Sequence, residues 1–361
     1  MDDVVTGVRS PFELDVQPIA RFLNAELRDH PVYDGIELQW FDDAWHGTGM
    51  LAFLSRRADR RVDYYAAPSL VLDRATYQIG GGTGAWVTTD FEAARLEVDD
   101  RGVVADVRFT DVDGRRIEVT VDDRGRRPRR ASDLLAPVGS GIDEPASLLL
   151  VYLHGFDLLR RSRRSPRIAI DGVPADTGVL PGGVLHRRHL IKAAAPLTVV
   201  TLCPTRRDEP LPVILDADRV SDDDAIAGLA VDRGDVAARL VLDPALPDLP
   251  ALPDEVQLHG IWRLDVDGAP VTGGTWHARR HGDRVDLGLD VTRPWQPPPG
   301  RPLLMRIVTR VMPLFRTWPT TYRWTGEVDL TVPEGRITSS WQRTTAERGE
   351  SYRRATGAAR R

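Results

Sequence analysis

Residues 103–121 read VVADVRFTDVDGRRIEVTV, and this stretch decides the fold class. Apolar and polar side chains alternate on both sides of the segment DVDG at 111–114. A period of two places successive side chains on opposite faces of a strand, and Asp and Gly tolerate the positive φ angles of a tight turn. The stretch therefore predicts a β-hairpin with strands at 103–109 and 116–121.

The same combination of strand and Asp/Gly turn recurs along the chain. Turn sequences of this kind stand at 98–102, 121–125, 265–268 and 280–283. Short, closely spaced strands are typical of sandwiches and barrels, whereas a βαβ protein alternates its strands with long helical segments. We therefore expect an all-β protein, whose last part has strands at 256–266, 271–279, 284–292, 321–331 and 335–344.

Two segments show helical periodicity instead. Residues 17–29 place four apolar side chains at positions i, i+3, i+4 and i+8 from Ile19, with a proline in the first turn. Residues 302–312 open with a proline, stop before Pro313 and are apolar around most of their circumference, apart from a narrow arc with two arginines and a threonine. Each segment predicts a short helix.

The composition limits the class of protein. The chain has 361 residues, a formal net charge of −5 and one cysteine, Cys203. An acidic chain is a poor general nucleic-acid binder, and one cysteine excludes an internal disulfide framework and a Cys-rich zinc site. No run of 18 apolar residues occurs, and the acidic start MDD lacks the apolar core of a secretion signal. We therefore expect a cytoplasmic protein, of open oligomeric state, that does not bind nucleic acid.

A proline-rich stretch at 243–254, DPALPDLPALPD, divides the chain. Its four prolines remove backbone donors and stiffen the chain, so the stretch predicts a connector. The expected domains are an N-terminal unit at 1–245, which starts with the helix, and a C-terminal unit at 246–361. Residues 127–245 exceed what a single barrel needs, and the sequence leaves open whether they complete the first barrel or form a subdomain.

The most enzyme-like segment is LVYLHGFD at 150–157. It resembles the strand that leads to the oxyanion hole of α/β-hydrolases, but the Gly-x-Ser-x-Gly elbow of that class is absent from the sequence. His154 and Asp157 remain the best candidates for catalytic residues, because imidazole titrates near neutral pH and a nearby carboxylate would orient it.

Aromatic residues are the best candidates for a ligand-binding wall. Six of the nine tryptophans lie in the last hundred residues. Large amphipathic rings line apolar cavities, although the same rings also serve as ordinary barrel core. The residues that we expect to contact a ligand are Tyr65, Trp86, Trp262, Trp276 and Trp324.

Lys192 is the single lysine of the chain. On a strand it would share a face with the apolar Leu190 and Ala194. A lysine buried there would be a reactive amine or base. The interpretation that we favour is a stem that lies along the surface with its ammonium group in water. We expect no metal site and no cofactor.

The tripeptide Gly-x-Trp occurs at 84–86, 260–262 and 274–276. It resembles the lipocalin pattern, in which Gly-x-Trp opens the first barrel strand and a basic residue near the last strand packs over the indole. Here Trp262 follows the proline-rich stretch, and Arg343 follows residues 337–341 of the last expected strand. Two such units resemble the tandem-lipocalin group, which includes the carotenoid 1,2-hydratases and fungal Diels–Alderases. The resemblance implies two lipocalin-like antiparallel β-barrels and catalysis without metal or organic cofactor, and it assigns no catalytic residue.

These observations predict a protein that binds a large apolar small molecule, such as an isoprenoid or a polyketide. Whether the ligand is also converted, by hydration, cyclisation or isomerisation, stays open. The alternative is a non-catalytic lipid carrier that contacts a membrane surface through residues 302–318, where arginines and aromatic rings accompany the expected helix.

Overall fold

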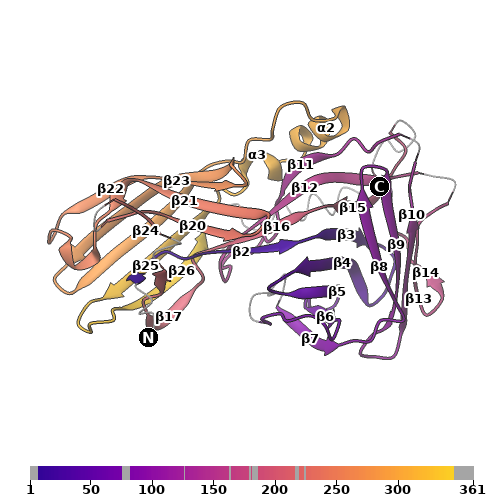
Figure 1. Cartoon of the computed structure of the whole chain (residues 1–361), viewed down its shortest axis with the longest axis horizontal. Helices are drawn as coiled ribbons and strands as arrows, with labels where there is room; N and C mark the ends of the chain where they lie inside the picture. Colours follow the sequence, from indigo (N-terminus) through magenta and orange to yellow (C-terminus); the bar gives the residue numbers. More distant parts are fainter. Residues whose placement is uncertain are drawn as a thin grey trace.

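Strands make up most of the computed structural model, which describes residues 7–74, 82–125, 127–161, 164–178, 180, 186–215, 219–222 and 225–344. Two large curled sheets form half-barrels, and short helices lie near the boundary between them (Figure 1). The all-β class expected from the sequence is therefore confirmed.

The first half-barrel is a ten-stranded sheet. Its spatial order is β2 (Leu14–Ile19), β16 (Leu197–Leu202), β12 (Leu148–Arg160), β15 (Arg188–Ala194), β3 (Arg21–Glu26), β4 (Tyr33–Asp43), β5 (Gly47–Arg56), β6 (Val62–Ala66) and β7 (Thr83–Thr88), with β11 (Ser132–Ala136) paired to β12.

A five-stranded sheet covers one face of the first half-barrel. Its order is β14 (Val173–Pro174), β13 (Arg167–Ile170), β10 (Arg116–Asp122), β9 (Gly102–Thr110) and β8 (Ala93–Asp99). Strands β9 and β10 form the hairpin predicted from residues 103–121. Alternate side chains of both sheets, such as Leu38 and Val107, are buried together in one apolar core.

The second half-barrel is a nine-stranded sheet. Its order is β17 (Arg206–Pro210), β26 (Arg336–Arg343), β25 (Tyr322–Asp329), β24 (Arg284–Arg293), β23 (Ala269–His281), β22 (Gln257–Val266), β21 (Val236–Leu246), β20 (Ala225–Arg233) and β19 (Arg219–Asp222). The five strands expected after residue 255 are confirmed. The helix expected at 302–312 is also confirmed, as α2 (Leu303–Val311), and α3 (Leu314–Thr317) follows it.

The helix predicted at 17–29 is wrong, because β2 and β3 occupy these residues. Both faces of the ten-stranded sheet are buried here. Phe22 belongs to the core that extends into the second half-barrel, whereas its neighbour Leu23 belongs to the core shared with the five-stranded sheet. Apolar residues therefore occur at both odd and even positions of the strands, and their spacing resembles that of an amphipathic helix.

The proline-rich stretch is only partly a connector. Residues 243–246 complete β21, which pairs with β20 and β22, and a register shift lies opposite this end of the strand. The 3₁₀ turn η2 (Leu249–Ala251) follows. The expected division at 245/246 therefore falls inside the nine-stranded sheet. Residues 127–204 supply strands to the first two sheets, and 206–246 supply strands to the nine-stranded sheet.

The N-terminal segment links the two half-barrels. β1 (Gly7–Arg9) pairs with β18 (Val213–Leu215), and the ring of Phe12 lies 5.6 Å from that of Trp324 in the second half-barrel. β2 then pairs with β16 in the first half-barrel and also contacts β20 and β21 of the second. The apolar core is consequently continuous between the two half-barrels.

Candidate functional site

His154 lies where β12 exchanges one neighbouring strand for another. Its backbone N–H donates to Pro196 O at 3.0 Å, and Gly155 takes a φ of +55°, which glycine adopts without strain. Imidazole Nε2 lies 3.0 Å from a carboxylate oxygen of Asp267 and 3.2 Å from the Thr198 hydroxyl. Asp267 belongs to the turn between β22 and β23, so His154 bridges the two half-barrels.

The interaction partners of Asp157 differ from those of His154. Its carboxylate is buried, lies 3.2 Å from the Arg188 guanidinium and accepts the backbone N–H of Leu158. Burial raises the pKa of this carboxyl, and the nearby Arg188 and Arg129 oppose the shift. The two residues expected to form an acid–base pair are thus held in separate interactions.

Three of the expected ligand-binding tryptophans lie in the core of the second half-barrel. Trp262, Trp276 and Trp324 are each at most 1% exposed. Trp276, Leu289, Trp324 and Trp341 are successive register partners across β23–β26, and we call these four residues the indole row. The indole N–H of Trp262 donates to Asp290 O at 3.1 Å, whereas those of Trp276 and Trp324 have no partner among the described residues.

The expected contact between Arg343 and an indole is not formed. In the described part of the chain Arg343 makes no cation–π contact, and its guanidinium Nε is buried without a hydrogen-bond partner. Its backbone N–H donates to Asp143 O. The tryptophans of this half-barrel therefore pack as core, without the closing arginine that the lipocalin pattern implied.

Tyr65 also serves as core, between the ten- and five-stranded sheets. It is fully buried, its ring lies 4.9 Å from that of Phe109, and its hydroxyl accepts the backbone N–H of Val112. The side chain of the preceding residue, Tyr64, points to the opposite face of β6. That opposite face carries the side chains best suited to ligand binding and acid–base chemistry.

One row of register partners crosses six strands of the first half-barrel. Each residue of the row stands opposite the next in the strand ladder, from β15 through β3, β4, β5 and β6 to β7. The row changes from polar to aromatic at β5, and we call it the polar–aromatic row: Lys192, Asn24, Glu37, Phe53, Tyr64 and Trp86.

The polar half of this row is hydrogen-bonded around Glu37. Asn24 Nδ2 donates to one carboxyl oxygen at 3.1 Å, and Gln39 Nε2 donates to the other at 2.7 Å. Lys192 Nζ donates to Asn24 Oδ1 at 3.2 Å and lies 3.5 Å from Glu26. The lysine side chain is 34% exposed. The side chain is therefore partly exposed, in line with the interpretation favoured above, but its ammonium group contacts Asn24 and Glu26.

Glu37 is an acid poised near neutrality. Burial raises the pKa of its carboxyl to about 7, against the opposing effects of Gln39, Asn24 and Lys192. A carboxyl with such a pKa can both give and accept a proton at physiological pH. Beside it, Gln39 is 3% exposed and its Oε1 has no hydrogen-bond donor among the described residues. A buried acceptor of this kind is costly unless a water or ligand donates to it.

The aromatic half consists of three rings in contact. Phe53 and Tyr64 meet edge to face with centroids 4.9 Å apart, and Tyr64 stacks on Trp86 at 4.8 Å. Trp86 is half-buried, and the guanidinium of Arg74 lies 5.8 Å from its ring. Trp86 is thus the predicted wall residue that the structure places in the same row as an acid–base group, three strands away from Glu37.

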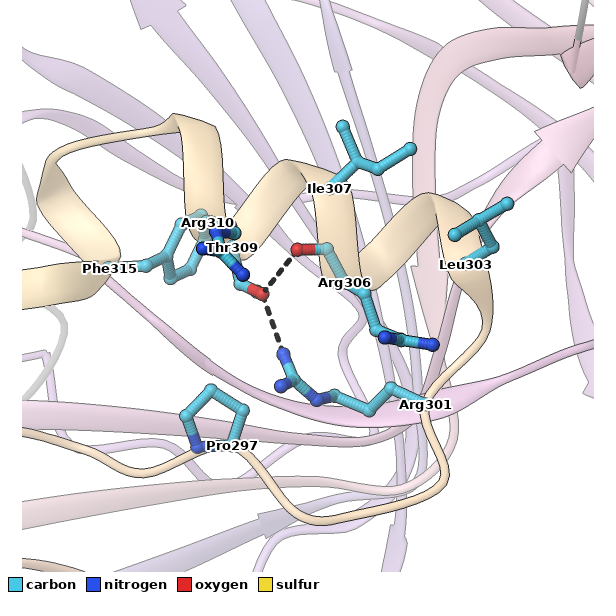
Figure 2. A pocket seen from close by; sticks show the side chains of 8 residues that line it. All are labelled: Pro297, Arg301, Leu303, Arg306, Ile307, Thr309, Arg310 and Phe315. Atoms are coloured by element: carbon cyan, nitrogen blue, oxygen red, sulfur yellow. Dashed lines mark hydrogen bonds between the residues drawn. The ribbon is translucent and has the colours of Figure 1, made fainter.

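Two hollows in the described structure lie against helix α2. The larger, of about 550 Å³, is lined by apolar side chains and by Arg301, Arg306 and Arg310 (Figure 2). The smaller, of about 130 Å³, brings Leu303 and Met305 against Asp157 and Arg188 of the first half-barrel. The second half-barrel therefore places α2 against strands β12 and β15 of the first.

The sequence analysis missed Glu37, Gln39 and Asn24. The available signal was GIELQWF at 35–41, where polar residues alternate with aliphatic ones in a strand of a sheet buried on both faces.

Among the described residues no group of three or more His, Cys, Asp or Glu side chains is arranged to hold a metal. Comparisons of the chain with protein-family models, curated proteins and solved structures find no match.

Proposed function

We propose that the polar–aromatic row binds a small molecule that is apolar along most of its length and carries a hydroxyl at one end. The observation that supports this most directly is the buried Gln39 Oε1, which lacks a donor beside Glu37. A ligand hydroxyl supplies that donor and accepts a hydrogen bond from the protonated carboxyl of Glu37 in return.

The remainder of the row selects the body of the ligand. From β4 to β7 the row crosses three strand spacings, about 14 Å. Along this length Phe53, Tyr64 and Trp86 offer aromatic faces to an isoprenoid or polyketide skeleton. Phe53 and Tyr64 are almost fully buried. A ligand that reaches them therefore displaces side chains that now cover them.

In this proposal Glu37 is the acid–base residue, in place of His154 and Asp157. Acid-catalysed hydration, cyclisation or isomerisation of an unsaturated molecule begins when a carbon–carbon double bond takes a proton, which the neutral Glu37 carboxyl supplies, and becomes a carbocation. The carboxylate left behind is stabilised by Lys192, Asn24 and Gln39. It regains its proton from water or from a neighbouring carbon of the intermediate.

Calorimetric titration with farnesol and with 2-naphthol tests the binding site. We expect at least one of these alcohols to bind, and we expect Gln39→Met to weaken that binding about tenfold through loss of one buried hydrogen bond. Trp86→Ala should weaken it further, whereas Trp45→Ala, on the exposed turn between β4 and β5, should leave it unchanged. Failure of both probes to bind, or equal affinity in the Gln39→Met variant, contradicts the proposal.

A further inference from the structure

Helix α2 exposes an apolar stripe. Leu303, Ile307 and Val311 follow one another at intervals of four residues, and each is between 51% and 67% exposed. Residues four apart on a helix lie on the same face. The opposite face is anchored, because Met305 and Thr309 are buried.

Four arginines accompany this stripe. Arg306 and Arg310 are exposed on the same helix, and Arg301 precedes it (Figure 2). Arg316 follows in α3 and is also exposed. Arg301 donates to the Thr309 hydroxyl and Arg316 to Arg310 O. Within the described residues none of the four forms an ion pair with a carboxylate. The chain as a whole has a net charge of −5, so this concentration of unpaired positive charge is local.

Buried aromatic residues fix the segment that carries the apolar stripe. Trp295 and Trp318, at the two ends of the segment that joins β24 to β25, are buried and are linked by a backbone hydrogen bond of 2.9 Å. Phe315 of α3 is also buried. The helix is therefore held in place by aromatic anchors while its apolar stripe faces outward.

We infer that α2 docks this protein on an anionic membrane surface. A helix that carries an apolar stripe and cations on its exposed side lies in the plane of the interface, with the stripe among the upper acyl chains and the arginines among the headgroups. The charge pattern favours an anionic membrane as the partner, because unpaired guanidinium groups complement phosphate and carboxylate headgroups. The remaining surface, acidic on balance, is repelled and fixes the orientation.

Sedimentation of the full chain with vesicles tests the inference. We expect binding to vesicles of phosphatidylcholine with 30% phosphatidylserine, little binding to pure phosphatidylcholine, and weaker binding as salt increases. Arg306→Gln and Arg310→Gln should each weaken binding about fivefold. The double variant Ile307→Ser/Val311→Ser should weaken it about tenfold or more, since both side chains are exposed and contribute little to folding.

The controls separate docking from other roles of the same surface. Val173→Ser and Arg207→Gln remove an exposed apolar and an exposed cationic side chain elsewhere, and both should bind vesicles like the wild type. Gln39→Met should also bind normally, because docking does not depend on the polar–aromatic row. The inference is overturned if the chain does not sediment with anionic vesicles at low salt. It is also overturned if the stripe variants abolish a concentration-dependent dimer seen by ultracentrifugation without changing vesicle binding.

Discussion

The two half-barrels present two rows of register partners with opposite chemistry. The indole row of the second sheet consists of apolar side chains, with its three tryptophans at most 1% exposed. The polar–aromatic row of the first sheet sets a lysine, an amide and a carboxyl beside three aromatic rings, and water reaches both of its ends. Rings that fill a core stabilise the fold, whereas buried polar groups cost stability and are kept where they serve a ligand or a reaction.

Truncating one ring in each row should give the largest contrast. Trp324→Ala should lower the free energy of unfolding by about 3–5 kcal/mol, because it leaves a large cavity in a closed core. Trp86→Ala should cost only about 1–2 kcal/mol, since its half-buried ring loses less apolar contact. Urea unfolding of both variants measures the difference. Equal losses would show that the two rows are both structural core.

Glu37→Gln should stabilise the protein at alkaline pH. The folded-state pKa of Glu37, about 7, lies above its ordinary value of 4.5, so folding favours the protonated carboxyl. Stability is therefore lost as the pH rises from about 4.5 through about 7, and Glu37→Gln should recover about 1–3 kcal/mol at pH 8. The gain should vanish at pH 4.

The matched control for that variant is Glu26→Gln, which lies on the adjacent strand β3 and is 50% exposed. It should change the free energy of unfolding little at either pH. A gain at pH 8 that is the same for both variants would mean that net charge, and not burial of Glu37, causes it.

The ion pair between His154 and Asp267, which joins the two half-barrels, should contribute the smallest amount to stability. His154 and Asp267 are both partly exposed, and such pairs couple by about 0.2–1 kcal/mol. A double-mutant cycle with His154→Gln and Asp267→Asn, which keeps the turn residue able to adopt its positive φ, measures this coupling. A coupling energy of zero would show that the pair does not link the two half-barrels.

Patterns within single strands could be predicted from the sequence, but contacts among distant strands could not. The hairpin at 103–121 was predictable because alternation and turn chemistry agree locally. The strands at 14–26 were not, because burial on both faces removed the alternation. Helix α2 was recognisable from its prolines and apolar circumference, although the sequence could not show which side faces outward.

The candidate site depends on register. Lys192 attracted attention as the single lysine, and Trp86 as one of the aromatic candidates, but 106 positions separate them in the chain. Only the pairing of six strands places them in one row with Glu37, and a shift of one residue in any pairing would turn side chains to the other face. His154 and Asp157 illustrate the converse, since proximity in sequence did not give them common partners.

The pH titration of the Glu37 carboxyl carbon by NMR tests the central claim most directly. Selective ¹³C labelling of glutamate and comparison with the Glu37→Gln variant identify the signal. We predict a midpoint near pH 7 for Glu37, the value that burial of its carboxyl gives it against the opposing hydrogen bonds from Gln39 and Asn24. A midpoint near 4.5 would show that the carboxyl is solvated like a surface glutamate, and the polar–aromatic row would then lose its acid–base role.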